Sequence, residues 1–177
     1  MIKANQFCIM LAIVLIHLEF SLVSACVISG ANVVIPNTWT EIGVSDFEGC
    51  SAVVTVTFQA PSIVAIIDKK AFKDAGNLES IIFPDSIEFI YDDAFNGCDK
   101  IASIVLPPNV ETIYSNSFKD MGDLTSFTFA VGSKLNRIES NGIKNTALTS
   151  ILLPTSLDRM DSECFKDNSA LVSINFF

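Results

Sequence analysis

The sequence lacks the residues that most enzyme active sites need. Its 177 residues contain one histidine, His17, which lies in an N-terminal segment that we expect to be removed. The remaining chain therefore has no Ser-His or Cys-His nucleophile and no histidine-containing zinc site. It also has no P-loop and no GxGxxG motif, and its acidic residues recur at turns instead of converging on one strand. We predict a non-enzymatic protein without catalytic, cofactor-binding or metal-binding residues.

Positive charge and long apolar runs are also scarce. The 11 lysines and arginines are outnumbered by 20 acidic residues, which gives a formal net charge of -9. Nucleic acid is therefore not an expected partner, because phosphate binding needs clustered basic residues. The apolar run Phe7 to Ile16 is about half the ~20 residues of a membrane-spanning helix. Half of all residues are hydrophobic, which excludes a disordered chain.

The N-terminus has the layout of a secretory signal peptide. Lys3 precedes the apolar run, and the segment ends in the small residues of Val23-Ser24-Ala25. We predict that residues 1–25 are removed and that the mature protein is secreted or located at the cell surface. An uncleaved N-terminal anchor is the alternative.

The cysteines leave two questions open at this junction. Val23-Ser24-Ala25-Cys26 resembles a bacterial lipobox, which makes Cys26 a candidate lipidation site, against ordinary cleavage before a structural cysteine. The membrane would then be contacted only through a lipid at Cys26 or an uncleaved signal. Cys50 and Cys98 occupy the same repeat position two coils apart, ~10 Å, so we expect two buried thiols. A Cys26–Cys50 bond is the alternative for Cys50.

One unit is repeated about six times along the rest of the chain. Its central, mostly aromatic position recurs every 22 to 25 residues, at Phe47, Phe72, Phe95, Phe118, Ile143 and Phe165. A period of this length predicts a solenoid, in which each unit buries its apolar face by stacking on its neighbours. We predict a partial coil at residues 26–34 and the solenoid at residues 35–177.

Within one unit, a strand is followed by a turn back. Ile81 and Phe83 are expected to point inward and Ser80 and Ile82 outward, because alternation marks a strand with one buried face. Pro84 ends the strand. Residues 93–98 then reverse the chain, where a single helical or 3₁₀ turn is one option.

The repeat resembles the BspA-like (Treponema-type) leucine-rich repeat. The match is clearest in Leu78-x-x-Ile81-x-Phe83-Pro84-x-x-Ile87-x-x-Ile90-x-x-x-Ala94-Phe95-x-Gly97-Cys98. The resemblance implies an α/β, strand-rich fold, a right-handed and curved leucine-rich-repeat solenoid. It also implies an exported, surface-associated protein involved in adhesion, and it supplies no catalytic residue.

The outward strand positions are the candidate partner-binding surface, because the strands are expected to line the concave face. One column carries hydroxyls, and the other carries apolar side chains facing solvent, which often mark an interaction surface. The alternative for the hydroxyls is structural: small residues that bond along the ladder. The candidates are Ser80, Ile82, Ser103, Val105, Ser126, Thr128, Ser150 and Leu152.

We therefore predict an exported binding or adhesion module whose partner is a protein or a surface glycan. The alternative is a structural surface protein, or a fragment of one, that self-associates through the open end of its solenoid. That alternative rests on Ile174 and Phe176, two inward positions with no further repeat to cover them. We expect either a truncated solenoid or an end covered by another chain.

Overall fold

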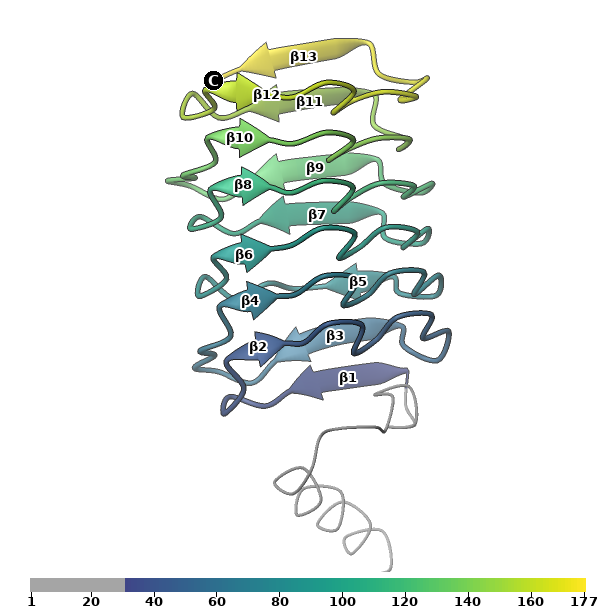
Figure 1. The fold of residues 1–177 in the computed structure, drawn as a ribbon, viewed down its shortest axis with the longest axis vertical. Helices are drawn as coiled ribbons and strands as arrows, with labels where there is room; N and C mark the ends of the chain where they lie inside the picture. Colours follow the sequence, from purple (N-terminus) through teal and green to yellow (C-terminus); the bar gives the residue numbers. More distant parts are fainter. Residues whose placement is uncertain (1–30) are drawn as a thin grey trace, which may run out of the picture.

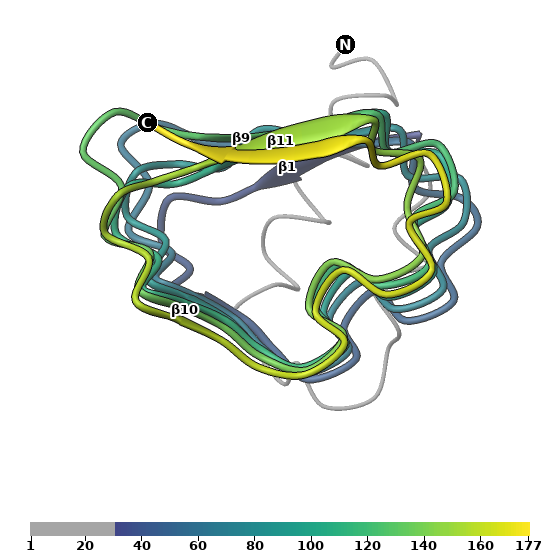
Figure 2. The same cartoon turned by 90° about the horizontal axis from the view of Figure 1, so that it is seen from above.

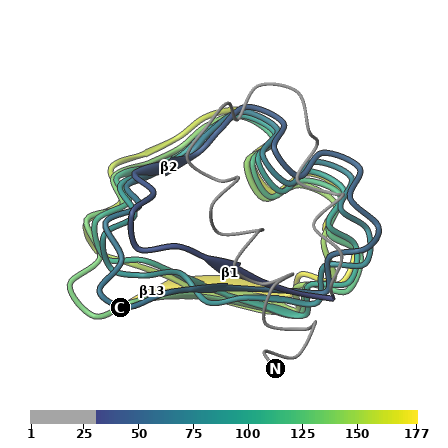
Figure 3. The same cartoon turned by 90° about the horizontal axis from the view of Figure 1, so that it is seen from below.

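The computed structural model describes residues 31–177 of the chain. The predicted signal peptide and Cys26 lie outside the described residues. Figure 1 shows short strands rising in register, one coil above the next. Seen along the stack, the coils superimpose into one closed outline, with strands on two opposite sides (Figures 2 and 3). The predicted strand-rich solenoid is thereby confirmed.

One side of each coil carries the longer strand, and we call these strands the long-strand face. Their side chains alternate between the core and solvent, as expected for a strand with one buried side. The strands are β1 (Asn32–Ile35), β3 (Thr55–Phe58), β5 (Ser80–Ile81), β7 (Ser103–Leu106), β9 (Ser126–Phe129), β11 (Ser150–Leu153) and β13 (Ser173–Phe176).

The opposite side carries strands of two residues each, and we call it the short-strand face. They form one unbroken parallel sheet, in the order β12-β10-β8-β6-β4-β2. Their bounds are β2 (Glu41–Ile42), β4 (Ile66–Ile67), β6 (Phe89–Ile90), β8 (Thr112–Ile113), β10 (Arg137–Ile138) and β12 (Arg159–Met160).

The long-strand ladder, in contrast, is divided into three pieces. Paired strands occur in the groups β1-β3-β5, β7-β9 and β11-β13. The pairing within each group is parallel and in register, for example Ser103 with Ser126 and Ser150 with Ser173. The predicted boundary at residue 35 falls inside β1, whose four residues all pair with β3.

The core consists of columns of equivalent residues, one from each coil. Ile42, Ile67, Ile90, Ile113 and Ile138 form one column and are completely buried. The predicted central residues form another. The rings of Phe47, Phe72, Phe95 and Phe118 stack nearly parallel, with successive centroids 4.9, 5.2 and 5.5 Å apart. Burial of such rings dominates core energetics, so these columns hold the stack together.

Two residues with left-handed backbone flank each central residue. They lie two positions before and two positions after it, at Ser45 and Gly49, Lys70 and Asp74, Asp93 and Gly97, Asn116 and Asp120, Asn141 and Asn145, and Glu163 and Asp167. Positive φ is tolerated best by Gly, Asn and Asp, and these types hold most of the positions after the central residue.

This turn joins each coil to the next through a third hydrogen-bond ladder. The backbone N–H groups of Lys70, Phe72 and Asp74 donate to carbonyl oxygens of the following coil at 3.1, 2.8 and 2.8 Å. Residues 31–177 contain no helix, so the reversal, for which a helical or 3₁₀ turn was one option, is made by these left-handed residues instead. The helical component of the predicted α/β class is reduced to turns.

The cysteines are only partly as predicted. Cys98 is a free, completely buried thiol, and burial raises its pKa far above the ordinary value. Cys50 is disulfide-bonded, so the expectation of a thiol there is wrong. Cys98 and Cys164 are free, and the partner of Cys50 therefore lies outside the described residues. Sequence spacing excluded only the Cys50–Cys98 pair.

The turn makes a glycine indispensable at one position. At Gly97, φ is +76° and an added Cβ would lie 2.5 Å from Oδ1 of Asp74. We expect Gly97→Ala to lower the free energy of unfolding by about 1–2 kcal/mol. Gly76→Ala is the control, because a Cβ there meets nothing within 4 Å and φ is not positive. Urea denaturation measures both, and equal stabilities of the two variants would contradict the assignment.

Candidate functional site

The eight candidate partner-binding residues all point outward from the long-strand face. Ser80, Ser103, Ser126 and Ser150 form one exposed column. Beside it, the side chains of Ile82, Val105 and Leu152 are 68%, 59% and 50% exposed, and Thr128 is exposed between the last two. The predicted register of the strands is therefore correct. Exposed apolar side chains grouped on one face are a common feature of interaction surfaces.

The serine hydroxyls of this column are not used to hold the ladder together. Among the described residues, none of the four makes a side-chain hydrogen bond. Threonines of the same face do: Thr55 Oγ1 donates to Asn32 Oδ1 at 2.6 Å, and Thr128 Oγ1 donates to the Ile104 carbonyl at 3.4 Å. The structural explanation of the hydroxyl row thus fits the threonines, whereas the serines are available to a ligand.

The face has a hollow where its ladder is interrupted between β9 and β11. The hollow has a volume of about 310 Å³ and is lined by Ser126, Thr128, Ser150 and Leu152, with Phe177 at its edge. Four of the predicted residues are thereby brought together at one place. Its lining combines apolar side chains with serine and threonine hydroxyls, as the linings of recognition sites do.

A second hollow of about 300 Å³ lies near the other end of the face. Its wall includes the predicted residue Ile82, together with Phe83 and Pro84 of the same coil and Thr57 and Phe58 of the coil below. Ser80, Ser103 and Val105 line neither hollow, and the last two lie on β7 between the hollows. Of the eight candidates, four therefore line one hollow, one lines the other, and three lie outside both.

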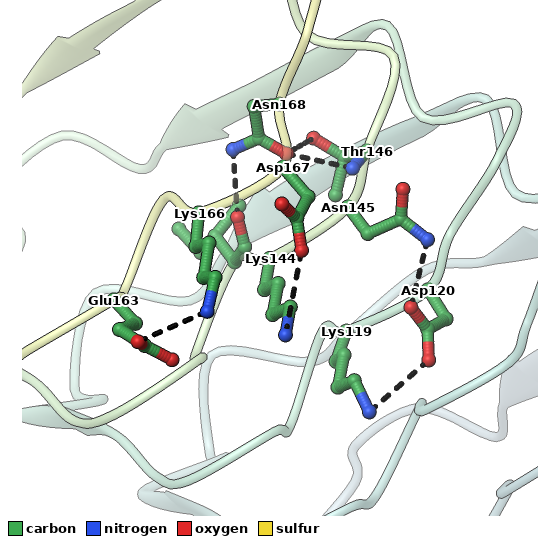
Figure 4. Close-up of polar contacts among 10 residues, drawn as sticks. Lys119, Asp120, Lys144, Asn145, Thr146, Glu163, Lys166, Asp167 and Asn168 are labelled. Carbon is green, nitrogen blue, oxygen red and sulfur yellow. Dashed lines mark hydrogen bonds and ion pairs between the residues drawn. The ribbon is translucent and has the colours of Figure 1, made fainter.

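The turn side carries charged residues that pair with one another. Figure 4 shows Lys119 with Asp120, Lys144 with Asp167, and Lys166 with Glu163, at 3.3, 3.4 and 3.0 Å. Such exposed pairs contribute ~0–1 kcal/mol each. The charges of these six residues are thus balanced within the turn side.

Asn168 links the last two coils on the same side (Figure 4). Its Oδ1 accepts hydrogen bonds from the backbone N–H and the hydroxyl of Thr146 at 2.7 and 3.0 Å. Its Nδ2 donates to the carbonyl of Ile143 at 2.8 Å. The side chain therefore adds to the backbone hydrogen bonds from Ile143 and Asn145 to the last coil, at the point where the repeat has lost its central phenylalanine.

Sequence reasoning missed an ion-pair network on the short-strand face. The guanidinium of Arg137 contacts Glu139 at 3.2 Å and Asp161 at 2.6 Å, and Nε of Arg159 contacts Asp161 at 2.7 Å. The hydrogen bond to Asp161 raises the pKa of Arg137, and the hydrogen bonds from Arg137 and then Arg159 lower the pKa of Asp161. The available signal was the alternation of charged residues at 137, 139, 159 and 161.

Two features are absent from residues 31–177: a metal-binding cluster and a membrane-spanning helix. No group of three or more His, Cys, Asp or Glu side chains in this part of the chain is placed to hold a metal ion. A helix long and apolar enough to cross a membrane is likewise absent from the described residues.

The family model for the BspA type leucine rich repeat region matches residues 24–133 and 103–177, with six copies. The chain belongs to this leucine-rich-repeat family. The family resemblance inferred from the repeat is thereby confirmed, and with it the solenoid class. No curated protein sequence matches the chain.

Solved structures of other leucine-rich-repeat proteins have the same fold. A leucine rich cell surface protein from Faecalibacterium prausnitzii is 30% identical, with a TM-score of 0.73 over 82% of this chain and 38% of that one. The T. pallidum leucine rich repeat protein is 27% identical, with a TM-score of 0.59 over 82% of this chain and 58% of that one. The chain thus spans less than two thirds of either relative.

A third structure supports the fold alone. The pneumococcal vaccine antigen PcpA is 23% identical, with a TM-score of 0.56 over 84% of this chain and 31% of that one. Binding surfaces are not transferred at this level of identity. The binding surface of this chain therefore depends on its own residues.

The ion-pair network predicts a pH-dependent stability difference. Because Asp161 has a pKa below 3.8 in the folded protein, its stabilising contribution is present above that value and is lost as the pH falls through the folded-state pKa. We expect Asp161→Asn to lower the thermal unfolding midpoint at pH 7, and the difference from the original protein to shrink below about pH 4.

Asp158→Asn serves as the matched control for this experiment. Asp158 is exposed in the same coil and its carboxylate has no partner among the described residues. Thermal unfolding followed by circular dichroism should leave this variant unchanged at both pH values. A difference for Asp161→Asn that stays constant from pH 7 to about pH 2 would show that the carboxylate charge is not the cause.

Proposed function

We propose that the protein is an exported, non-enzymatic binding or adhesion module that holds its partner on the long-strand face. The partner is a protein or a surface glycan. The observation that carries the proposal is the set of eight outward side chains, which combines exposed apolar groups with serine hydroxyls that have no intramolecular partner. Apolar groups supply affinity on leaving water, and hydroxyls supply orientation.

The geometry of the face supports docking of an irregular partner surface. Two hollows of about 300 and 310 Å³ lie at different heights along it, and each is large enough to accept a side chain or a sugar ring. Leu152 lines one of them and Ile82 lines the other, while Val105 is exposed between them. Anchors placed in hollows are typical of the residues that dominate binding energy.

Two further observations support export. The first is the signal-peptide pattern of residues 1–25, and the second is the disulfide bond at Cys50, because such bonds persist mainly in oxidising compartments. The similar protein from F. prausnitzii is described as a cell surface protein. We therefore propose that this protein is secreted or displayed at the surface.

The disulfide bears on the lipidation proposal. Besides Cys98 and Cys164, which are free, the sequence offers only Cys8 and Cys26 as partners of Cys50. Removal of residues 1–25 would leave Cys26. A thiol bonded to Cys50 is not available for acylation, so a Cys26–Cys50 bond and a lipid anchor at Cys26 are mutually exclusive in one molecule.

The long-strand proposal predicts that charge on the face abolishes binding without unfolding the protein. We expect Val105→Lys combined with Leu152→Lys to lower affinity at least tenfold, because both exposed apolar contacts would become charged. The purified protein is first screened against arrays of immobilised extracellular proteins and glycans. Any partner is then titrated with the double variant by surface plasmon resonance, and circular dichroism checks folding.

Val131→Lys is the matched control for this pair. Val131 is 100% exposed and lies in the turn between β9 and β10, away from the long-strand face. This variant should bind like the original protein. If the double variant binds as tightly as the control, the long-strand face is not the site; if it unfolds, Val105 and Leu152 have a structural role.

Self-association is the second candidate, supported by the apolar end of the described solenoid. Ile174, Phe176 and Phe177 are 40%, 55% and 57% exposed there, whereas equivalent residues of inner coils such as Ile151 and Leu153 are 3% and 0% exposed. The unpaired edge of β13 adds free backbone groups, which favour strand-to-strand pairing.

This candidate predicts a dimer that depends on the end of the stack. Sedimentation velocity should show concentration-dependent association, and Ile174→Lys combined with Phe176→Lys should shift the protein toward monomer. Val131→Lys again provides a charge change at an exposed apolar residue elsewhere. A protein that stays monomeric at all concentrations would rule out this alternative.

A further inference from the structure

The short-strand face carries an aromatic surface that the long-strand proposal does not use. Phe89 lies on β6, Tyr91 follows it, and Tyr114 follows β8 in the next coil. The rings of Phe89 and Tyr91 stack with centroids 5.7 Å apart, and those of Tyr91 and Tyr114 lie 5.0 Å apart. Phe89 is 36% exposed and the two tyrosines are partly exposed, so faces and edges of these rings reach solvent.

A hollow of about 300 Å³ lies against this surface. Phe89 and Tyr114 contribute aromatic walls, while Glu88 and Glu111 contribute one carboxylate from each of two successive coils. Lys134, from the coil above, completes the lining. Repetition of the coil places the two carboxylates at equivalent positions of neighbouring coils, one above the other along the stack, where they line the same hollow as the rings.

The two carboxylates are not neutralised within the protein. Glu88 and Glu111 are exposed, and neither makes a side-chain hydrogen bond or ion pair with any described residue. Elsewhere on this face, Glu139 and Asp161 are paired with arginines. In the hollow, by contrast, two carboxylates adjoin two aromatic rings, and the lysine in its lining, Lys134, forms no ion pair with a described residue.

Charges of both signs surround the hollow. The pKa of Tyr114 is raised, first by burial and then by the neighbouring Tyr91, Glu139 and Asp92, and is lowered by Arg137. Asp92 forms an ion pair with Lys69 at 3.4 Å, and the side chain of this lysine is largely exposed. With a net charge of -9 over the chain, the protein attracts positively charged partners over a distance.

We propose that this hollow is a second binding site, for the cationic side chain of a lysine or arginine in a basic segment of a partner protein. An ammonium or guanidinium group is attracted to the faces of Phe89 and Tyr114 and forms charge-assisted hydrogen bonds with Glu88 and Glu111. Lys134 opposes the cation and sets an upper limit on its affinity. The site lies on the face opposite the long strands, so both faces could be occupied together.

The probe is an acetylated and amidated tetralysine peptide, titrated into the purified protein and followed by backbone amide NMR. We expect the amide signals of Phe89 and Thr112 to shift. Glu88→Gln combined with Glu111→Gln should weaken binding about five- to tenfold, since each exposed carboxylate accounts for roughly a few-fold. Phe89→Ala should weaken it further, and binding should weaken as the salt concentration rises.

Lys134→Gln gives a change of opposite sign. Removing this positive charge should strengthen tetralysine binding about two- to threefold, which a structural effect on the hollow does not explain. Glu79→Gln is the matched control, because it removes one exposed carboxylate beside the long-strand face and should leave the affinity unchanged.

Three results would overturn the proposal. The first is the absence of shifts at the hollow with tetralysine. The second is equal weakening by Glu79→Gln, which would indicate attraction by net charge alone. The third is a response of the same amides to maltotetraose with none to tetralysine, which would make the hollow a glycan site instead.

Discussion

The structure depends on one constraint: every coil must return to the same register after 22 to 25 residues. The left-handed residues on either side of each central residue achieve this, since they turn the chain sharply while pointing backbone N–H groups at the next coil. The buried ring between them fills the interior of the coil. Because the phenylalanine rings then stack nearly parallel, the same element sets both the direction of the chain and the spacing of the layers.

Because the inward residues and the turns satisfy this constraint, the outward positions of both sheets are not needed for core packing. Inward positions are uniformly apolar, whereas outward positions differ between the two faces, with serines and aliphatic residues on one face and aromatic and charged residues on the other. In a repeat protein such variation on a fixed scaffold produces binding surfaces. The two faces have different chemistry, and this supports two different kinds of partner contact.

Much of the fold follows from sequence because the repeat signals its own register. Alternation in Ser80-Ile81-Ile82-Phe83 specifies which side chains face solvent, and these predictions were confirmed at Ile82, Val105 and Leu152. The division of the long-strand ladder was not predictable in this way. The ladder is interrupted after the two-residue strand β5 and again between the four-residue strands β9 and β11, although the alternation of side chains is the same along all of them.

The missed features share a physical cause. Positive φ at Lys70 or Glu163 leaves no trace in hydrophobicity, and lysine and glutamate are unusual at such positions. The contacts of Arg137 with Asp161, and of Tyr91 with Tyr114, join residues that are neighbours only after coils are stacked. The error at Cys50 had a different origin, because its bond involves a residue outside the repeats.

The unequal continuity of the two sheets determines how the solenoid deforms. Six short strands are hydrogen-bonded without a break from the first coil to the last, whereas the long-strand ladder is interrupted between β5 and β7 and between β9 and β11. The continuous short-strand sheet is therefore expected to be the stiffer side of the solenoid. On the opposite face, bending is expected at the two interruptions of the ladder. A change in curvature would therefore alter the width of the hollow between β9 and β11 more than the spacing of the short strands.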